Sequence, residues 1–174
     1  MKLIGIIGEP ATGKTTLMCS ILKRLGDDYM KFRYGLLRGR AYARERYVLG
    51  IYRTGERFAG TDRLSMAVYS DAIKFIKSRP ASAIVAFEGD RLTRHNFLAS
   101  VIYDDLVLFH IVCSDEERDR RHVARGDTQP RSFTRSRRTL IAGILARYSA
   151  TEIANETAGD LERAADQIAD AIGR

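Results

Sequence analysis

The fold of this chain is limited most strongly by one short segment, GEPATGKT, at residues 8–15. This segment fits the pattern G-x-x-x-x-G-K-[ST]. It follows the apolar run from Leu3 to Ile7, which has the length of a buried strand, and it precedes residues 14–25, whose apolar side chains recur at helical spacing. A strand, a glycine-rich turn and a helix in this order predict a loop that binds phosphate groups.

The spacing inside this loop has a physical reason. Backbone N–H groups turn inward around phosphate oxygens, and glycine is needed where a side chain would collide with them. The helix N-terminus adds a partial positive charge. Lys14 is then expected to reach the outer phosphates of ATP or GTP, and the Thr15 hydroxyl to ligate Mg²⁺. A glycine-rich turn without function is the alternative. The residues expected to bind the nucleotide are Gly8, Pro10, Ala11, Thr12, Gly13, Lys14, Thr15 and Thr16.

Acidic residues follow a second apolar run, Ala83 to Phe87, at the place where that predicted strand must end. Glu88 and Asp90 stand where phosphate-binding proteins of this kind carry a metal-binding acid, and we favour Glu88 for the metal. Either carboxylate can instead activate an attacking hydroxyl group, or cap the following turn. Arg91 is a candidate clamp for a phosphate group.

Asp62 is a second candidate catalytic base. It follows Gly60 and Thr61, and a carboxylate beside a glycine turn can accept a proton from a bound hydroxyl group. The alternative is that it caps a helix predicted over residues 63–78. Arg63 beside it is expected to hold the phosphate of the substrate.

An arginine-rich stretch over residues 118–138 predicts a closing lid. Arg118, Arg121 and Arg125 lie at i, i+3 and i+7 and share a helix face, and further arginines follow Pro130. A lid excludes water, and Arg121 and Arg125 would stabilise the charge that develops on a phosphoryl group during transfer. The alternative is a solvated basic helix.

Composition limits the class of protein. A chain of 174 residues has the length of one domain, so we expect a single kinase-sized domain over residues 1–174. The longest strongly apolar stretch, Leu106 to Val112, is too short to cross a membrane. The first apolar run breaks at Gly8, too early for a secretory signal, so a cytoplasmic location is expected.

Basic residues are concentrated in two segments. The chain carries a net charge of +7, and 23 of its 29 basic residues are arginine. Residues 31–63 hold nine basic and three acidic side chains, and residues 118–138 hold eight arginines and two aspartates. Because a guanidinium group matches phosphate oxygens, both segments indicate contact with phosphates or with a polyanion.

Alternation of strand and helix signals indicates a parallel sheet with helices on both faces. Apolar runs predict strands at residues 3–7, 83–87 and 106–113, and residues 29–57 are expected to form strands and irregular structure. Helices are predicted at residues 14–25, 63–78, 93–102, 114–125, 132–148 and 160–172, with a capping box of Ser114 and Glu117. The fold expected is a three-layer α/β domain of the nucleoside monophosphate kinase type, with a mostly parallel sheet of about five strands.

The guanine-reading segment N/T-K-x-D of small GTPases is absent from the sequence, and larger ATPases need a longer chain. A small phosphotransferase remains. Four segments resemble the bacteriophage P-loop kinases that phosphorylate 5-hydroxymethyluracil bases within DNA. They are GEPATGKTT (8–16), GTDRLSM (60–66), FEGDRL (87–92) and RHVARGDTQPRSF (121–133).

This resemblance implies transfer of the γ-phosphoryl group of ATP or GTP to a hydroxymethyl group in DNA, in the cytoplasm of an infected host if a phage encodes the chain. Arg33 and Arg38 are then expected to bind DNA, in a basic region where Phe32, Tyr34, Tyr42 and Tyr47 are placed to stack on bases. One alternative is a deoxynucleoside monophosphate kinase acting on free pyrimidine nucleotides. Another is a nucleotide-dependent DNA-binding or regulatory protein without transfer activity, which the acids at 62 and 88 disfavour.

Overall fold

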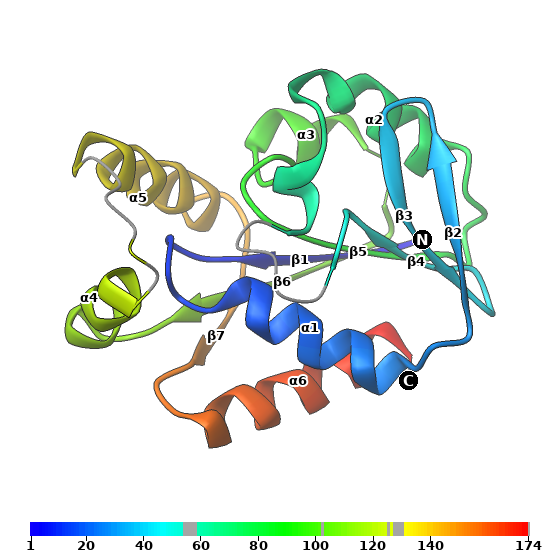
Figure 1. The fold of residues 1–174 in the computed structure, drawn as a ribbon. Helices are drawn as coiled ribbons and strands as arrows, with labels where there is room; N and C mark the ends of the chain where they lie inside the picture. Colours follow the sequence, from blue (N-terminus) through cyan, green and yellow to red (C-terminus); the bar gives the residue numbers. More distant parts are fainter. Residues whose placement is uncertain (54–58, 102, 125, 127–130, 174) are drawn as a thin grey trace.

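The computed structural model describes residues 1–53, 59–101, 103–124, 126 and 131–173. It contains a twisted sheet covered by helices on both faces (Figure 1). The strands, in chain order, are β1 (Lys2–Ile7), β2 (Tyr29–Tyr34), β3 (Leu37–Tyr42), β4 (Arg46–Leu49), β5 (Ile84–Glu88), β6 (Asp105–Val112) and β7 (Thr151–Ala154). The α-helices are α1 (Lys14–Leu25), α2 (Tyr69–Lys77), α3 (His95–Ser100), α4 (Asp115–Ala124), α5 (Arg131–Leu145) and α6 (Ala158–Ile172).

The strand order across the sheet is β2-β3-β4-β5-β1-β6-β7. The five strands from β4 to β7 in this order are parallel, and β2 and β3 extend the β4 edge as an antiparallel hairpin. The prediction of a mostly parallel α/β fold is therefore confirmed. The sheet has seven strands instead of about five because residues 29–49 form three strands.

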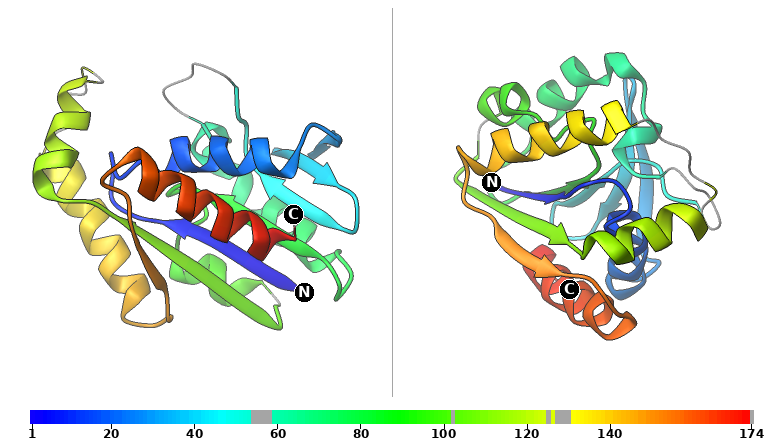
Figure 2. Two further views of the ribbon diagram at one scale, coloured as in Figure 1. Left: turned by 90° about the horizontal axis from the view of Figure 1, so that it is seen from below. Right: turned by 90° about the vertical axis from the view of Figure 1, so that its left-hand side faces the viewer.

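Two apolar cores lie on opposite faces of the sheet. Helices α1 and α6 lie side by side over one face, as the left view of Figure 2 shows, and their core includes Leu17, Ile21 and Ile168. Helices α2, α3 and α5 cover the other face, where Phe75 and Phe97 contribute to the core. Since both faces are covered, the central strands are apolar on both sides, which explains their nearly continuous hydrophobic sequence.

Parallel pairing determines where the predicted site residues meet. β1 lies between β5 and β6, and Ile6 of β1 is in register with Glu88 of β5. The phosphate-binding loop leaves the end of β1, so it begins beside the end of β5. Glu88 at the end of β5, Asp90 after it and the loop that follows β1 therefore share one edge of the sheet.

The helix predicted over residues 63–78 is wrong at its start. Two short 3-10 helices, η1 (Thr61–Arg63) and η2 (Met66–Val68), precede α2. Leu64 between them is extended, with ψ 158°, and buried. The Ser65 hydroxyl accepts a hydrogen bond from the Ala67 N–H at 3.2 Å and begins a new turn. Burial of Leu64 in the core thus interrupts the helical periodicity that the sequence suggests.

The capping box predicted at Ser114 and Glu117 is only half formed. The Glu117 N–H donates to the Ser114 hydroxyl at 3.2 Å, but the Ser114 N–H donates to the carboxylate of Glu156. A complete capping box forms at α6 instead, between Thr157 and Asp160. The Glu117 carboxylate is therefore available for other partners, which lie at the candidate site.

Among the described residues, no helix combines the length and apolar character that a bilayer crossing requires.

Ile168→Ala is expected to destabilise the fold by about 2–5 kcal/mol, because it leaves a cavity between α6 and the sheet at a fully buried position. Urea unfolding measures this loss. Val123→Ala, at a side chain that is 81% exposed, is the control and should change stability by less than about 0.5 kcal/mol. Equal stability of the two variants would contradict the packing described for α6.

Candidate active site

The loop between β1 and α1 has the backbone of a phosphate-binding turn. Gly8 and Gly13 have φ angles of 156° and 91°, and Ala11 is also left-handed with φ 63°. The Lys14 ammonium donates to the carbonyl oxygens of Gly8 and Glu9, at 2.7 and 2.8 Å, and thus lies folded across the loop. The predicted nucleotide-binding residues 8–16 lie together in one turn and the first residues of α1.

Gly13 lies against two side chains from distant parts of the chain. A Cβ atom at this position would come within 2.4 Å of Nδ2 of Asn155 and 3.4 Å of a guanidinium nitrogen of Arg121. Asn155 donates from Nδ2 to the Thr12 carbonyl at 2.7 Å, and Arg121 donates to the carbonyl oxygens of Asn155 and Ala11 at 2.7 and 3.4 Å. Only glycine fits at position 13, and these contacts fix the loop to α4 and to the end of β7.

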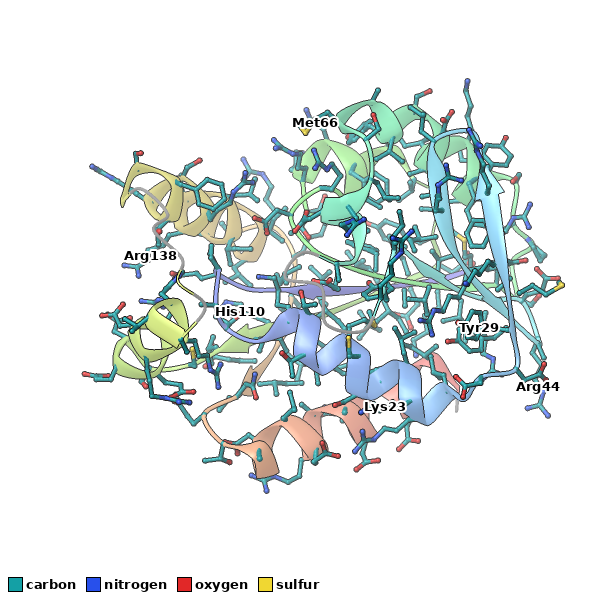
Figure 3. All side chains as sticks on the ribbon, in the orientation of Figure 1. Lys23, Tyr29, Arg44, Met66, His110 and Arg138 are labelled. Carbon is teal, nitrogen blue, oxygen red and sulfur yellow. The ribbon has the colours of Figure 1, made fainter. Side chains whose placement is uncertain are left out.

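Glu9 connects the loop to both arginine-rich helices. Its carboxylate lies 3.3 Å from the Arg118 guanidinium of α4, and Arg138 of α5 donates to it from two nitrogens at 3.1 and 3.2 Å. Figure 3 shows Arg138 in the space between α4 and α5. The predicted lid arginines therefore lie beside the phosphate loop, where α4 and α5 each contribute one ion pair to Glu9.

Glu88 is the buried acid of the site. Its side chain is 1% exposed, and no hydrogen bond from the described residues reaches its Oε1. Burial raises the pKa of Glu88 to about 8, opposed by nearby Lys14 and by a hydrogen bond from Thr15 and reinforced by Asp62 and Asp90. Lys14, Thr15, Asp62 and Asp90 therefore all lie close enough to Glu88 to influence its pKa.

The absence of a side chain at Gly60 leaves room for the carboxyl group of Glu88. A Cβ atom at residue 60 would lie 2.1 Å from Oε1 of Glu88, and Gly60 has a φ of 72°. Thr61 donates its hydroxyl hydrogen bond to the Glu88 carbonyl at 2.7 Å. The Gly60–Thr61 pair thus fixes the segment that carries Asp62 against the end of β5.

Asp62 and Asp90 are held in different ways. The Asp62 carboxylate accepts hydrogen bonds from the backbone N–H groups of Asp90 and Arg91, the latter at 3.0 Å. Desolvation raises the pKa of Asp62, and the charge of Asp90 adds to this rise, although the Asp62 side chain still reaches solvent. Asp90 instead forms an ion pair with Arg137 of α5, at 3.2 Å. Arg91 also donates from its guanidinium to the Asp62 carbonyl at 3.0 Å.

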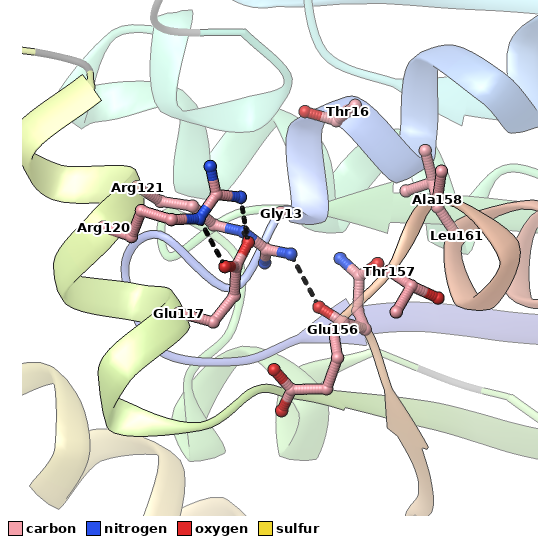
Figure 4. A pocket seen from close by; sticks show the side chains of 10 residues that line it. Gly13, Thr16, Glu117, Arg120, Arg121, Glu156, Thr157, Ala158 and Leu161 are labelled. Carbon is pink, nitrogen blue, oxygen red and sulfur yellow. Dashed lines mark hydrogen bonds and ion pairs between the residues drawn. The ribbon is translucent and has the colours of Figure 1, made fainter.

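A pocket of about 260 Å³ opens beside the loop. Figure 4 shows Glu117, Arg120 and Arg121 entering it from α4, with Glu156 and Thr157 on the other side after β7. Hydrogen bonds from Arg120 and Arg121 hold the pKa of Glu117 down to about 2, so its carboxylate stays charged and orients both arginines. The pocket is adjacent to Gly13 and Thr16, at the N-terminus of α1.

The donor groups at the site fit Mg²⁺ shared with a nucleotide. The unpartnered Oε1 of Glu88 and the Thr15 hydroxyl are hard oxygen donors of the kind this ion prefers, and they would hold it. No group of three or more His, Cys, Asp or Glu side chains suited to a metal occurs in the part of the chain that is described. Such a sparse set is typical of Mg²⁺ sites that phosphates complete; when bound, the ion neutralises phosphate charge.

Two predicted substrate-binding residues lie away from this cluster. Arg33 and Arg38 face each other on the β2–β3 hairpin, and β4 and β5 separate that hairpin from β1. Arg63 is exposed on η1, directly after Asp62. Arg125, predicted to be catalytic, lies outside the described residues, as do residues 127–130 of the predicted lid.

The prediction that aromatic rings of this region stack on bases is wrong for Tyr42 and Tyr47, which are buried, and for Phe32, which stacks on Phe75; Tyr34 is 38% exposed. Phe32 and Tyr34 pack on Phe75 of α2, with ring centroids 4.7 and 5.7 Å apart, and Tyr47 also contacts that ring. Tyr42 is 6% exposed, in the core under α1. Alternation along each strand turns these rings toward helices because burial of the rings is more favourable than their exposure.

Sequence reasoning missed Asn155, Glu117, Arg137 and the side chain of Glu9. Asn155 follows β7, a strand of four residues with one buried position, and a strand so short gives little periodicity to detect. The only sequence signal was the polar segment Asn155–Thr157 before α6. The partners of Glu9 and Arg137 depend on how α4 and α5 pack, which local sequence does not specify.

Comparison with known proteins identifies the family of the chain. Among curated proteins, none matches the chain. An unliganded crystal structure of a sugar kinase from Janibacter sp. HTCC2649 aligns over 100% of this chain and 99% of its own, with 13% identity and a TM-score of 0.48. The family model of P-loop Nucleotide Kinase3 matches residues 1–172. The chain therefore belongs to this P-loop nucleotide kinase family, whose members are phosphotransferases of the kinase type.

Proposed function

We propose that this kinase transfers the γ-phosphoryl group of ATP or GTP to the hydroxymethyl group of 5-hydroxymethyluracil in DNA. The observation that carries the proposal is the convergence of Lys14 and three carboxylates at one edge of the sheet. The resemblance of residues 60–66 and 87–92 to the phage DNA-base kinases supplies the acceptor. An alcohol acceptor needs a base beside the phosphates, and this arrangement provides one.

Asp62 is the residue we assign as the base. Glu88 is buried and hydrogen-bonded to Thr15, the other residue expected to ligate Mg²⁺, so we assign it to the metal. Asp90 forms an ion pair with Arg137. Asp62 alone of the three is exposed, and two backbone N–H groups hold it. Its carboxylate accepts the hydroxymethyl proton, the oxygen forms a bond to the γ-phosphorus, and the bond to the β–γ bridging oxygen breaks to release the nucleoside diphosphate.

The arginines around the loop are placed to stabilise the negative charge of the phosphoryl group during its transfer. Arg121 already touches the loop carbonyl of Ala11, and its guanidinium lies beside Gly13. The 260 Å³ pocket next to Thr16 is the place we assign to the nucleoside of the donor. Residues 118–138 then act as the lid that covers the phosphates.

A deoxynucleoside monophosphate kinase is the second candidate. Arg63 follows Asp62 in the chain, and Arg91 lies beside Asp62 in the fold. Two guanidinium groups are enough to hold one phosphate monoester. In that case, the acceptor is the phosphate of a free pyrimidine nucleotide.

An acceptor panel distinguishes the two candidates. Donor labelled in its γ-phosphoryl group is offered with Mg²⁺ to hydroxymethylated DNA, to unmodified DNA with free 5′-hydroxyl groups and to pyrimidine monophosphates. We expect label only on hydroxymethylated DNA, and its loss in Lys14→Ala, which removes the cation of the loop. Label on the monophosphates alone would replace the proposed acceptor, and undiminished transfer by Lys14→Ala would contradict the role of the loop.

Asp62→Asn should lower kcat about 10²- to 10⁴-fold while leaving the Kd for the nucleotide within about twofold, because the base acts only on the acceptor. Steady-state kinetics and nucleotide titration measure the two quantities. Asp28→Asn, on the loop before β2, is the control and should retain full turnover. A larger loss in Asp90→Asn than in Asp62→Asn would assign the base to Asp90.

Glu88→Gln should remove part of the pH dependence of stability. The pKa of Glu88 rises on folding from 4.5 to about 8, so between these values the folded state binds the proton that the unfolded state has lost. The stabilisation is complete below about pH 4.5 and disappears as the pH rises toward 8. Urea unfolding from pH 5 to 8 should show a decline in the wild type that is weaker in Glu88→Gln; parallel curves would contradict the buried carboxyl.

A further inference from the structure

We propose that the β2–β3 hairpin binds the sugar-phosphate backbone of a DNA strand and delivers that strand to the transfer site. The surface concerned, here called the hairpin face, carries Lys31, Arg33, Arg38 and Arg40. This inference rests on the proposed function, since it names the element that holds the polymeric acceptor.

The strand register gathers the four cations on one face. Lys31 lies opposite Arg40, and Arg33 lies opposite Arg38. Directly opposed residues of an antiparallel pair share a face, and residues two apart on a strand share it also. Successive cations along each strand are therefore about 7 Å apart, which matches the rise of about two nucleotides of one strand along the axis of B-DNA.

Like charges directly opposite one another destabilise a hairpin unless a counter-charge is present. Lys31, Arg33 and Arg38 are exposed, and none forms an ion pair with an acidic side chain among the residues described. Arg33 donates to the carbonyl of Gly35 in the turn, and Arg40 stacks over the Tyr29 ring at 4.3 Å. Repulsion of this kind across a strand pair favours a polyanionic partner with regularly spaced charges.

The hairpin is held rigidly enough to present this face. Its opposite side packs through Phe32 on Phe75, with the rings stacked at 4.7 Å. The Leu36 N–H in the turn donates to the Asp71 carboxylate of α2 at 2.8 Å. The cations are thus displayed from a strand pair anchored to α2, as Figure 1 shows for the hairpin beside that helix.

The hairpin face is suited to bind phosphate groups, and it has little exposed aromatic surface on which a base could stack. The rings of Phe32 and Tyr34 are on the other side of the strands. On the face itself, Tyr42 is 6% exposed and Tyr29 is covered by Arg40. Without an open ring for stacking, binding there must depend on phosphates and be nearly independent of base composition.

Backbone contacts connect this face to the transfer site. The Gly50 N–H donates to the Arg38 carbonyl at 2.8 Å, and the next residue, Ile51, pairs with Gly60 through two hydrogen bonds of 3.0 and 2.8 Å. Gly60 in turn lies against Oε1 of Glu88. The backbone that carries the hairpin face is therefore joined through Gly50 and Gly60 to the segment beside Glu88, and the proposed DNA strand has to cross β4 to bring its hydroxymethyl group to the carboxylates.

The test uses the full chain carrying Lys31→Gln, Arg33→Gln and Arg38→Gln together. Fluorescence anisotropy follows binding of labelled 20-nucleotide oligo-dT and oligo-dA between 50 and 200 mM NaCl. Each phosphate neutralised on a single strand contributes about 0.7 to the slope of log K against log salt, so the triple variant should lose about 2 from that slope. We expect at least a tenfold loss of affinity at 50 mM NaCl, and equal affinity of the wild type for the two oligonucleotides within about threefold.

The control removes three exposed cations elsewhere, with Lys74→Gln, Lys77→Gln and Arg147→Gln, and should bind both oligonucleotides like the wild type. Equal losses in both triple variants, or no loss in the hairpin variant, would overturn the proposal. A tenfold preference for one oligonucleotide would overturn the assignment to the backbone. So would tighter binding to phosphatidylserine vesicles than to DNA.

Nucleotide binding separates this proposal from the proposed function. The hairpin variant should bind a fluorescent ATP or GTP analogue with wild-type Kd, which also shows that it is folded. Hairpin-dependent DNA binding without transfer to hydroxymethylated DNA would refute the proposed function alone. Transfer to that DNA with full efficiency by the hairpin variant would refute the hairpin proposal alone.

Discussion

Parallel pairing between β1 and β5 places a buried carboxylate beside an ammonium group, and the remaining features of the site depend on this pair. Lys14 begins the helix that follows β1, and Glu88 ends β5, so two adjacent strand ends bring the ammonium group and the carboxyl group close together. The positive charge of Lys14 opposes the rise in the pKa of Glu88. Gly60 and Thr61 fit against Glu88, and Asn155 holds the loop that precedes Lys14 through the Thr12 carbonyl.

The site could be predicted from sequence where it depends on contiguous residues. The loop, the helix that it opens and the acids after β5 are specified by neighbours in the chain, and the structure shows them as expected. The extra hairpin could not be placed, since residues 29–49 alternate only weakly, and packing against Phe75 decides which side of the hairpin is buried. The contact of Asn155 with Thr12 also could not be predicted, because it joins residues more than 140 positions apart in the sequence.

The arginines of this chain fall into two groups that composition alone does not separate. Those of α4 and α5 are largely engaged within the protein: Arg118, Arg121, Arg137 and Arg138 all have acidic partners. Arg33 and Arg38 of the hairpin are exposed and lie opposite each other across the strands, whereas Arg40 lies opposite Lys31 and stacks over Tyr29. A single basic surplus thus includes arginines that are paired with acids around the loop and exposed arginines that face other cations.

The double engagement of Glu9 has a consequence for how tightly a triphosphate can be held. A phosphate that takes the place of Glu9 on Arg118 or Arg138 has to displace the carboxylate that the guanidinium now holds. The affinity gained is the difference between two charged contacts, much smaller than either one. An exchange of counter-ions of this kind favours quick departure of the spent diphosphate over long residence.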